Sequence, residues 1–337
     1  MAIVQRARVQ SLSTCDLPAA VRLTPRFDHE SLQQDLSVLE RVVWLPEEPY
    51  RFEGFFGSET KVFHDGRWSG LSLRSQGGRS DRTDPGGPGL EDFQNTELTE
   101  VARHLTDLMG ALNTPLRSAR LLRLPPGASI GEHRDTYHGL EYGQLRLHVP
   151  ITTNDGVENF VRGKPMKWLP GELWYGDFGS RHYVRNNGST DRVHFVIDAL
   201  ITPGLLQLFP AEVAARFSDI DILFHEEPVK LSDDILASLE CTFRLPSTLV
   251  RGIFDIDDGI EAEMIARIAL SDRALYFDVG NRRLFKLSPL SGNRLAFVGW
   301  TMERYFHYEC SAGRVTSFSL WLLRGHQATT VQFQLLS

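Results

Sequence analysis

The spacing of apolar residues predicts two amphipathic helices near the start of the chain. Leucines and a valine recur at helical intervals over 29–43, directly behind Asp28, a residue type that caps helix N-termini. A second stripe of leucines and a valine predicts a helix over 96–109, with Gly110 placed to end it. Each helix has a single apolar face, so we expect both of them to brace a sheet.

Short segments of alternating or continuous apolar residues, which are typical of β-strands, fill the middle of the chain. Strands are predicted over 68–74, 120–124, 144–151, 159–161, 172–175, 181–184 and 192–200. Turns rich in Gly, Pro and Asn separate the later strands at short intervals. Such spacing favours an antiparallel sandwich or barrel over units in which strands and helices alternate.

A run rich in glycine and proline over 77–89 predicts a mobile loop. It is not a phosphate-binding loop, because it lacks the Gly-Lys-Ser/Thr ending and no helix follows directly. Two interpretations stay open: a plain surface excursion, and a lid over the substrate that becomes ordered on binding.

We expect two domains, over 1–205 and 206–337, the second a small α+β appendage without a catalytic pattern. Its predicted helices cover 211–217 and 260–269, and its predicted strands cover 274–279, 283–287, 294–298 and 331–335. The run over 255–259 resembles a calcium loop, but its glycine comes one place early and the closing glutamate is missing, so we interpret it as a solvated turn.

Composition and charge are those of an ordinary cytoplasmic enzyme. The net charge of −7 argues against a nucleic-acid partner or an anionic membrane, since no basic face is available to neutralise phosphates. No apolar run approaches the length of a membrane span, and the first residues lack the apolar core of a signal peptide. The scattered Cys15, Cys241 and Cys310 are interpreted as reduced thiols.

Three residues between 131 and 200 could bind a metal. His133 and Asp135 are two residues apart, and on an extended strand such residues point to the same face, which places an imidazole beside a carboxylate. His182, further along the chain, can complete the set. Two histidines and one carboxylate on one side of a metal are the facial arrangement of non-haem Fe(II) oxygenases. Zinc more often takes sulfur or a third nitrogen.

Arg192 adds a second candidate feature, because it begins a predicted strand over 192–200. Polar and apolar residues alternate there before the run becomes apolar, which indicates a strand with one buried face, next to the strand that begins at His182. A buried arginine is costly unless its planar fork meets a carboxylate. An arginine that faces an iron pocket therefore implies an acidic ligand.

The same stretch resembles the aspartyl/asparaginyl β-hydroxylase family of Fe(II)/2-oxoglutarate dioxygenases, in particular its bacterial branch, which includes a proline cis-4-hydroxylase. The resemblance covers roughly residues 25–205, the first half more loosely. The residues that carry it are His133-Arg134-Asp135, the runs over 144–151 and 168–177, Ser180-Arg181-His182, Arg192 and Asp198.

The resemblance implies a mainly β fold, a double-stranded β-helix (a cupin-like jelly roll) braced by the two N-terminal helices. It implies Fe(II) held by His133, Asp135 and His182, with 2-oxoglutarate and O2 as co-substrates. It also implies that Arg192 pairs with the C5 carboxylate of 2-oxoglutarate, while Arg146 and His148 lie near its C1 carboxylate.

The activity implied by the resemblance is hydroxylation of an unactivated C–H bond of an amino acid, with release of succinate and CO2. The substrate is either a free amino acid such as proline or a residue held in a peptide or on a carrier. Arg74 is a candidate partner for a substrate carboxylate, and Trp68 is a candidate wall of the pocket; the alternatives are an ordinary salt bridge and a core aromatic residue. Oligomeric state stays open.

Other functions were weighed against this hypothesis. A kinase catalytic loop is excluded, because the position five residues after Asp135 is Leu140 where an asparagine is needed. A related halogenase would lack the carboxylate that Asp135 supplies. A non-catalytic cupin-type protein that binds a small ligand is the main alternative. His138, His194 and the pair His64-Asp65 are interpreted as surface residues or as neighbours of the ligands.

Overall fold

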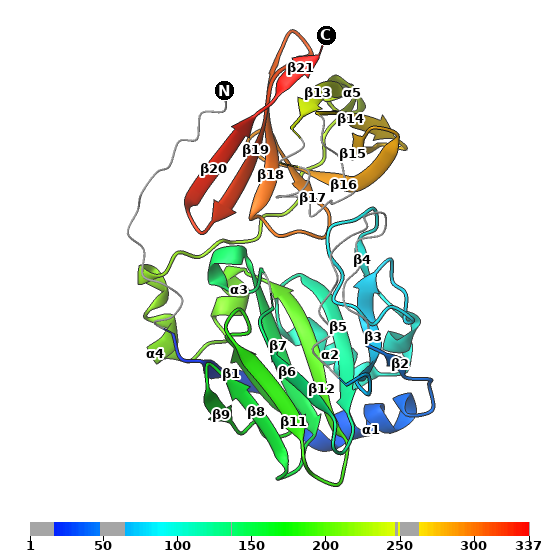
Figure 1. Cartoon of the computed structure of the whole chain (residues 1–337), viewed down its shortest axis with the longest axis vertical. Coiled ribbons are helices and arrows are strands. Elements are labelled where there is room, and N and C mark those ends of the chain that lie inside the picture. The colour runs from blue at the N-terminus through cyan, green and yellow to red at the C-terminus, as the bar shows by residue number, and fades with distance from the viewer. Residues whose placement is uncertain (1–16, 48–64, 136, 247–248, 250–262, 337) are drawn as a thin grey trace.

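The computed structural model describes residues 17–47, 65–135, 137–246, 249 and 263–336. The calcium-like run over 255–259, His64 and Cys15 lie outside these residues. Figure 1 shows a sheet coloured yellow to red above a larger body coloured blue to green. Within the described residues, no helix is both long and apolar enough to cross a membrane.

The first predicted helix is confirmed in its start but is shorter than predicted. Helix α1 covers His29–Leu39, and its N-cap is Asp28, whose carboxylate accepts a hydrogen bond of 2.9 Å from the Ser31 N–H. The helix ends before Val43 because the chain turns back, and the Trp44 indole N–H donates to the Leu39 carbonyl at 3.2 Å. Strand β2, Leu45–Pro46, follows at once.

The second predicted helix is divided into two pieces. A 3-10 helix covers Glu97–Glu100, and helix α2 covers Arg103–Ala111, so Gly110 lies in the last turn instead of ending the helix. The division has a tertiary cause. Asp35 of α1 accepts a hydrogen bond of 2.8 Å from the Leu105 N–H and thereby caps the first turn of α2.

Two facing antiparallel sheets form the double-stranded β-helix that was expected. The major sheet contains β5 (Leu116–Leu124), β7 (Gln144–Thr152), β10 (Glu172–Gly176) and β12 (Arg192–Leu200) in the order β10-β7-β12-β5, and is extended by β1 (Ala20–Arg26), β2, β3 (Ser69–Gln76) and β4 (Phe93–Asn95). The other sheet contains β6 (Ser129–His133), β8 (Val157–Val161), β9 (Lys164–Met166) and β11 (His182–Asn186) in the order β6-β11-β8-β9.

Both faces of the major sheet are buried, which corrects the prediction of one buried face for residues 192–200. Phe195 and Ile197 of β12 pack outward, in one apolar core with Leu36 of α1 and Leu105 of α2. The alternate residues of the strand face the second sheet and are largely polar; Arg192, His194 and Asp198 are all buried there. The fold thus encloses a polar interior between two sheets.

Strands dominate the C-terminal part of the chain. Helices α3 (Pro203–Leu206), α4 (Ala211–Ala214) and α5 (Asp233–Ser238) precede a nine-stranded antiparallel sheet. Its strands are β13 (Cys241–Leu245), β14 (Met264–Ser271), β15 (Ala274–Val279), β16 (Arg282–Leu290), β17 (Arg294–Phe297), β18 (Arg304–Ser311), β19 (Arg314–Arg324), β20 (Gln327–Gln332) and β21 (Gln334–Leu336). The predicted helix over 260–269 is wrong from Met264 onward, because β14 pairs with β13 and β15 on either side.

This sheet curls into a nearly closed unit, which we call the C-terminal barrel. Strands β20 and β21 lie at opposite ends of the sheet order but are consecutive in the chain, and Phe333 between them donates its N–H to Phe318 of β19. Its core is rich in phenylalanine and is separate from the core of the jelly roll. Because α3 and α4 pack on the jelly-roll core, we propose that the two domains divide after them and not at residue 205.

Candidate metal centre

The structure brings His133, Asp135 and His182 together at one end of the polar interior. His133 is the last residue of β6 and lies opposite His182, the first residue of β11. Asp135 lies just beyond β6 and not on it, at 3.5 Å from Nε2 of His133 and 3.9 Å from Nε2 of His182. One donor atom from each residue lies within 4.8 Å of the others, so the three can hold a metal ion.

Backbone carbonyls fix the orientation of both imidazoles. Nδ1 of His133 contacts the Gly131 carbonyl at 2.8 Å, and Nδ1 of His182 contacts the Ser180 carbonyl at 3.0 Å. Each Nδ1 therefore carries a proton, and each Nε2 points toward Asp135, which is the orientation of metal-binding histidines. Burial lowers the pKa of His182 to about 4, which keeps its ring neutral and able to bind a metal at neutral pH.

Asp135 is held as a carboxylate by its neighbours. Its N–H donates to the Phe178 carbonyl at 2.9 Å, and its Oδ2 accepts from Nη1 of Arg146 at 2.5 Å. Burial alone would raise the pKa of Asp135, but Arg146 and His133 outweigh it and hold the pKa well below its usual range. The side chain is thus ionised and correctly charged for a divalent cation.

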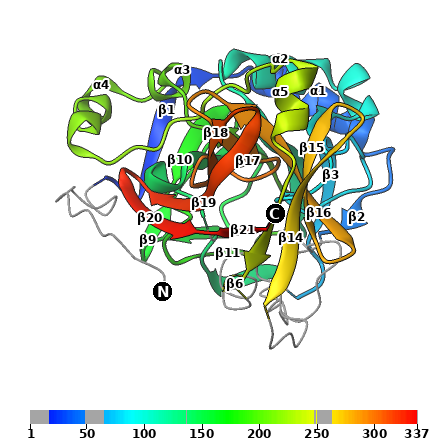
Figure 2. The same ribbon diagram turned by 90° about the horizontal axis from the view of Figure 1, so that it is seen from above.

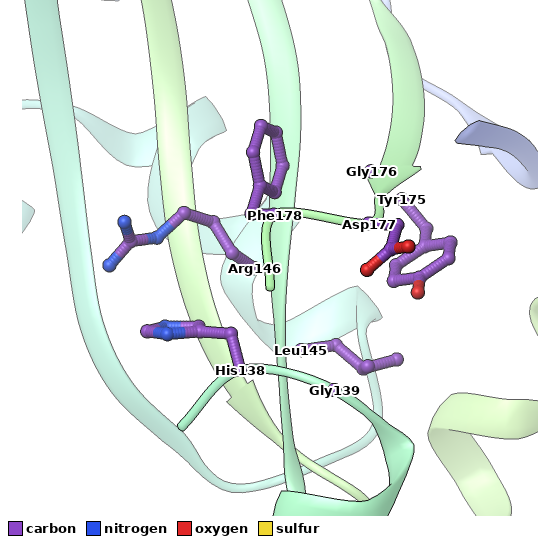
Figure 3. Close-up of a pocket in the computed structure, with 8 residues that line it drawn as sticks. All are labelled: His138, Gly139, Leu145, Arg146, Tyr175, Gly176, Asp177 and Phe178. Atoms are coloured by element: carbon purple, nitrogen blue, oxygen red, sulfur yellow. The ribbon is translucent and has the colours of Figure 1, made fainter. Parts of the chain in front are cut away.

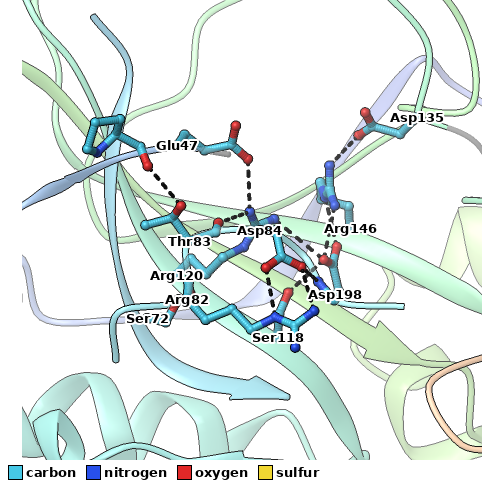
Figure 4. A network of polar contacts seen from close by, with 12 residues as sticks. Glu47, Ser72, Arg82, Thr83, Asp84, Ser118, Arg120, Asp135, Arg146 and Asp198 are labelled. Atoms are coloured by element: carbon cyan, nitrogen blue, oxygen red, sulfur yellow. Dashed lines mark hydrogen bonds and ion pairs between the residues drawn. The ribbon is translucent and has the colours of Figure 1, made fainter. Parts of the chain in front are cut away.

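A chain of buried charges extends from Asp135 across the inner face of the major sheet (Figure 4). Asp198 accepts two hydrogen bonds from Arg146, at 2.7 and 3.0 Å, and another from Ser118. Arg120 lies 3.7 Å from Asp198 and 3.3 Å from Glu47. Alternating signs let these charges be buried together, because each one meets an opposite charge.

Arg192 stands apart from that chain of charges. It is 3% exposed, its Nη2 contacts Nδ1 of His194 at 2.9 Å, and its buried Nε has no hydrogen-bond partner in the described part of the chain. Within the described residues no carboxylate pairs with it, and burial alone lowers its pKa to about 9. Strand β12 lies in the sheet opposite to β11, so Arg192 faces the strand of His182 and is not beside it as predicted, because consecutive jelly-roll strands change sheets.

Aromatic rings join the cluster to the surroundings of Arg192. The Phe178 ring packs edge-on against His182, with 4.9 Å between centroids, and stacks on His148 at 4.7 Å. His148 is buried, its Nδ1 contacts His194 at 3.3 Å, and its Nε2 has no hydrogen-bond partner among the described residues. His148 and Arg192 therefore each have a buried nitrogen that makes no hydrogen bond with the described residues.

Arg74 and Trp68, the two candidate substrate residues, make contacts that stabilise the fold. The Arg74 guanidinium donates to the carbonyls of Leu116 and Phe93 and to the Asn95 side chain, so it ties β3 to β4 and β5. Trp68 packs in a small apolar cluster with Leu124, Ala128, Ile130 and Val184. These contacts fit the structural alternatives for both residues, and their substrate roles stay predictions.

Several residues of this site were not predicted from the sequence. Asp198 was included in the family pattern without a role, and His138, interpreted as an accessory residue, contacts Asp198 at 3.3 Å. The residues Phe178, Ser118, Arg120 and Glu47 were not singled out.

A narrow cleft beside Arg146 is lined by His138, Gly139, Leu145, Tyr175, Gly176, Asp177 and Phe178 (Figure 3). In the sequence, the polar residues at alternate positions of β12 were the feature that could have indicated this polar interior.

Comparisons with known proteins agree with this geometry. The family model of the Aspartyl/Asparaginyl beta-hydroxylases matches residues 34–201. L-proline cis-4-hydroxylase of Rhizobium meliloti (strain 1021) is 28% identical over 178 residues, which are 51% of this chain and 58% of that protein. The chain therefore spans less than two thirds of the length of this relative.

Two solved structures are also similar. A 2OG-Fe(II) oxygenase family oxidoreductase from Burkholderia pseudomallei has a TM-score of 0.36 and 15% identity, and the match covers 58% of this chain and 94% of that one. A Pseudomonas putida prolyl-4-hydroxylase has a TM-score of 0.33 and 10% identity, with 55% and 93% covered. Through residues 34–201, the chain belongs to the aspartyl/asparaginyl β-hydroxylase family.

Proposed function

We propose that this protein is an Fe(II)/2-oxoglutarate-dependent dioxygenase that hydroxylates an unactivated C–H bond of an amino acid. The observation that carries the proposal is the pairing of two features inside one jelly roll: a His-His-Asp cluster, and a buried arginine that has no carboxylate partner in the part of the chain that the structure describes. The family membership of residues 34–201 supports the same function.

The cluster fits Fe(II) by the chemistry of its donors. His133 and His182 would supply one imidazole nitrogen each and Asp135 one carboxylate oxygen, which is the two-histidine, one-carboxylate set of non-haem iron enzymes. Structural zinc sites more often use four ligands that include sulfur, and no cysteine is among these three. With 2-oxoglutarate and O2, iron in such a site supplies the oxidising power for hydroxylation, and succinate and CO2 are released.

The interior also fits a dicarboxylate co-substrate. The buried guanidinium of Arg192 offers a planar fork for a carboxylate, and pairing would remove the cost of its isolation. The Arg146 guanidinium contacts Asp135 of the cluster, and His148 stacks on Phe178, whose ring packs against His182. We propose that Arg192 binds the C5 carboxylate of 2-oxoglutarate and that Arg146 and His148 lie near its C1 carboxylate.

The remaining residues orient the ligands and exclude water. Arg146 keeps Asp135 ionised, and Asp198 fixes Arg146 through two hydrogen bonds. Phe178 and Trp168 form an apolar wall beside His148 and His182, which shields the reacting centre from solvent. Shielding and orientation are the contributions that a protein makes when the cofactor supplies the reactive species.

The substrate we propose is a small amino acid. The relative from Rhizobium meliloti is named for hydroxylation of proline, and free proline is therefore our first choice. A residue held in a peptide or on a carrier is the second choice, because the ligand set and Arg192 would be the same for both.

Anaerobic titration with Fe(II) and then 2-oxoglutarate tests the proposal. We expect a weak visible metal-to-ligand charge-transfer band only when both are present, and no band in Asp135→Ala. Succinate release against a panel of amino acids and peptides then identifies the substrate. If the folded protein takes up a metal but gives no band, the 2-oxoglutarate function is rejected and the ligand-binding alternative replaces it.

A further inference from the structure

The C-terminal barrel is docked on two loops of the jelly roll. The N–H of Gly89 donates to the Val298 carbonyl, and the N–H of Lys286 donates to the Gly89 carbonyl, at 3.1 and 2.9 Å. On the other side, the Thr301 hydroxyl donates to the Tyr142 carbonyl at 2.5 Å. Figures 1 and 2 show β17 and β18 directly over this part of the jelly roll.

Arg304, the first residue of β18, lies at the centre of that contact. It is 5% exposed, its Nε and Nη2 each lie 2.8 Å from the Glu303 carboxylate, and its guanidinium lies 4.0 Å from the centre of the Trp300 ring. The same guanidinium lies 5.1 Å from the ring centre of Tyr137, a residue of the jelly roll. A cation–π contact stabilises the position of the ring that the cation covers.

Tyr137 follows the metal-binding carboxylate by two residues and needs such support. Its φ of 57° is in the left-handed region, which a side chain as large as tyrosine rarely adopts without surrounding contacts. Its carbonyl accepts from Gln144 at 2.7 Å, and Gln144 in turn accepts from Arg117 at 2.5 Å. Tyr137 is 45% exposed, and its ring contacts the Arg304 guanidinium on one side and, edge-on, the Tyr142 ring at 5.8 Å between centroids.

We propose that the C-terminal barrel holds the metal-binding loop in place and that Arg304 is a positioning residue for Asp135, acting through the ring of Tyr137. Asp135 on one side of Tyr137 is tied to Phe178 and Arg146, and His138 on the other side is tied to Asp198. Arg304 contacts Tyr137, which lies between them in the chain. The inference rests on the proposed function only for the identity of the metal.

Hydrogen exchange of the metal-free protein and the dissociation constant for Mn²⁺ test this role. In Arg304→Ala we expect faster exchange in peptides that contain Asp135 and Tyr137, and a dissociation constant raised by about two- to fivefold, the effect of losing a partly exposed cation–π contact. Tyr137→Ala should match Arg304→Ala, whereas Tyr137→Phe, which keeps the ring, should behave as the wild type. The double variant should add little to either single alanine.

Arg283→Ala is the matched control. Arg283 makes the same pair of contacts in the same barrel, with Asp278 at 3.1 Å and the Tyr276 ring at 4.0 Å, but none of these residues belongs to the jelly roll. We expect it to leave both readouts unchanged.

Unchanged exchange and Mn²⁺ affinity in Tyr137→Ala, or an equal effect of Arg283→Ala, would overturn the inference. The Tyr137 pair keeps the test valid even if Arg304→Ala unfolds the barrel. Neither readout uses 2-oxoglutarate, so a missing charge-transfer band would reject the proposed function without deciding this question.

Discussion

At the level of one residue, Arg192 shows how the free-energy cost of burying an unpaired charge can indicate a ligand. Its buried guanidinium contacts one imidazole and, among the residues that the structure describes, no carboxylate, which is unfavourable in the folded protein unless an anion binds. The same isolation therefore makes the site selective for an acidic ligand. The buried Nε2 of His148 has the same property on a smaller scale.

For Arg192→Ala we expect the Michaelis constant for 2-oxoglutarate to rise by about 10- to 100-fold, since a charged hydrogen bond contributes about 1.5–3 kcal/mol. Fe(II) affinity should stay close to the wild-type value, because the three ligands are untouched. The ligand-free protein should unfold at higher urea, since a buried unpaired charge is removed. Arg185→Ala is the control, because Arg185 is an exposed arginine that packs on Tyr183. An unchanged requirement for 2-oxoglutarate would refute the assigned role.

Glu47 gives the fold a dependence on pH. Burial raises its pKa from 4.5 to about 7, although Arg120 opposes the shift. The folded state thus binds the proton more tightly than the unfolded chain, and the stability contributed by this group is present below about pH 4.5 and is lost as pH rises to about 7. Each pKa unit corresponds to about 1.4 kcal/mol, so the loss is at most a few kcal/mol.

Urea unfolding at about pH 5 and about pH 7.5 measures this effect. In Glu47→Gln the difference between the two free energies of unfolding should shrink, because glutamine does not titrate. Glu132→Gln, which removes an exposed partner of Arg181, should keep the wild-type difference. If both variants keep it, the buried carboxyl is not the group that titrates.

At the level of elements, the sequence predicted what local pattern determines and missed what distant contacts determine. The start of α1 and most strands of the jelly roll follow from the Asp28 cap and from alternation. The break before α2 does not, because Asp35 of another helix causes it. Polar residues on β12 suggested a solvent face, since the sequence does not distinguish the lining of a buried site from a surface.

The same distinction applies to the candidate site. His133, Asp135, His182 and Arg192 come from one stretch whose spacing and family pattern are visible in the sequence. The partners that support them, such as Glu47 and Arg304, come from distant segments that only the folded chain brings near. The family pattern therefore identified the proposed ligands, whereas the residues that support them can be identified only in the folded structure.

Replacing Asp35 tests whether this residue of α1 caps the start of α2. In Asp35→Ala the Leu105 N–H loses its buried acceptor and His104 loses its partner, so we expect the free energy of unfolding to fall by about 1–3 kcal/mol. Asp28→Ala removes the exposed cap of α1 and should cost about 1 kcal/mol. A smaller loss for Asp35→Ala than for Asp28→Ala in urea unfolding would show that α2 starts independently of α1.

The whole molecule has separate apolar cores in the jelly roll and in the C-terminal barrel. A small apolar cluster of Leu223, Leu290, Ala296 and Met302 joins them beside the backbone contacts. The jelly-roll core runs through Ile222 and the core of the C-terminal barrel begins at Leu236. At the contact, the segments around Gly87 and Gly299 approach so closely that a Cβ on Gly299 would lie 1.8 Å from the Gly87 carbonyl oxygen. This approach places the glycine-rich loop over 77–89 against β16 and β17, and Ser72, Arg120 and Gln76 bind its other side.

Gly299→Ala tests how far this contact stabilises the molecule. The new methyl group would meet a backbone oxygen that has little room to move, and the φ of 87° adds strain, so we expect a loss of roughly 3 kcal/mol or more in the free energy of unfolding. Gly313→Ala isolates the strain, because Gly313 has a φ of 73° and nothing within 4 Å of its Cβ position; its loss should be about 1 kcal/mol.

Limited proteolysis of both variants then distinguishes local from global effects. If docking protects the loop over 77–89, cleavage there should be faster in Gly299→Ala than in Gly313→Ala at a urea concentration where both are folded. Equal cleavage and equal stability would mean that the two cores are held together elsewhere. Faster cleavage confined to Gly299→Ala would show that the barrel restrains a loop that its composition alone predicts to be mobile.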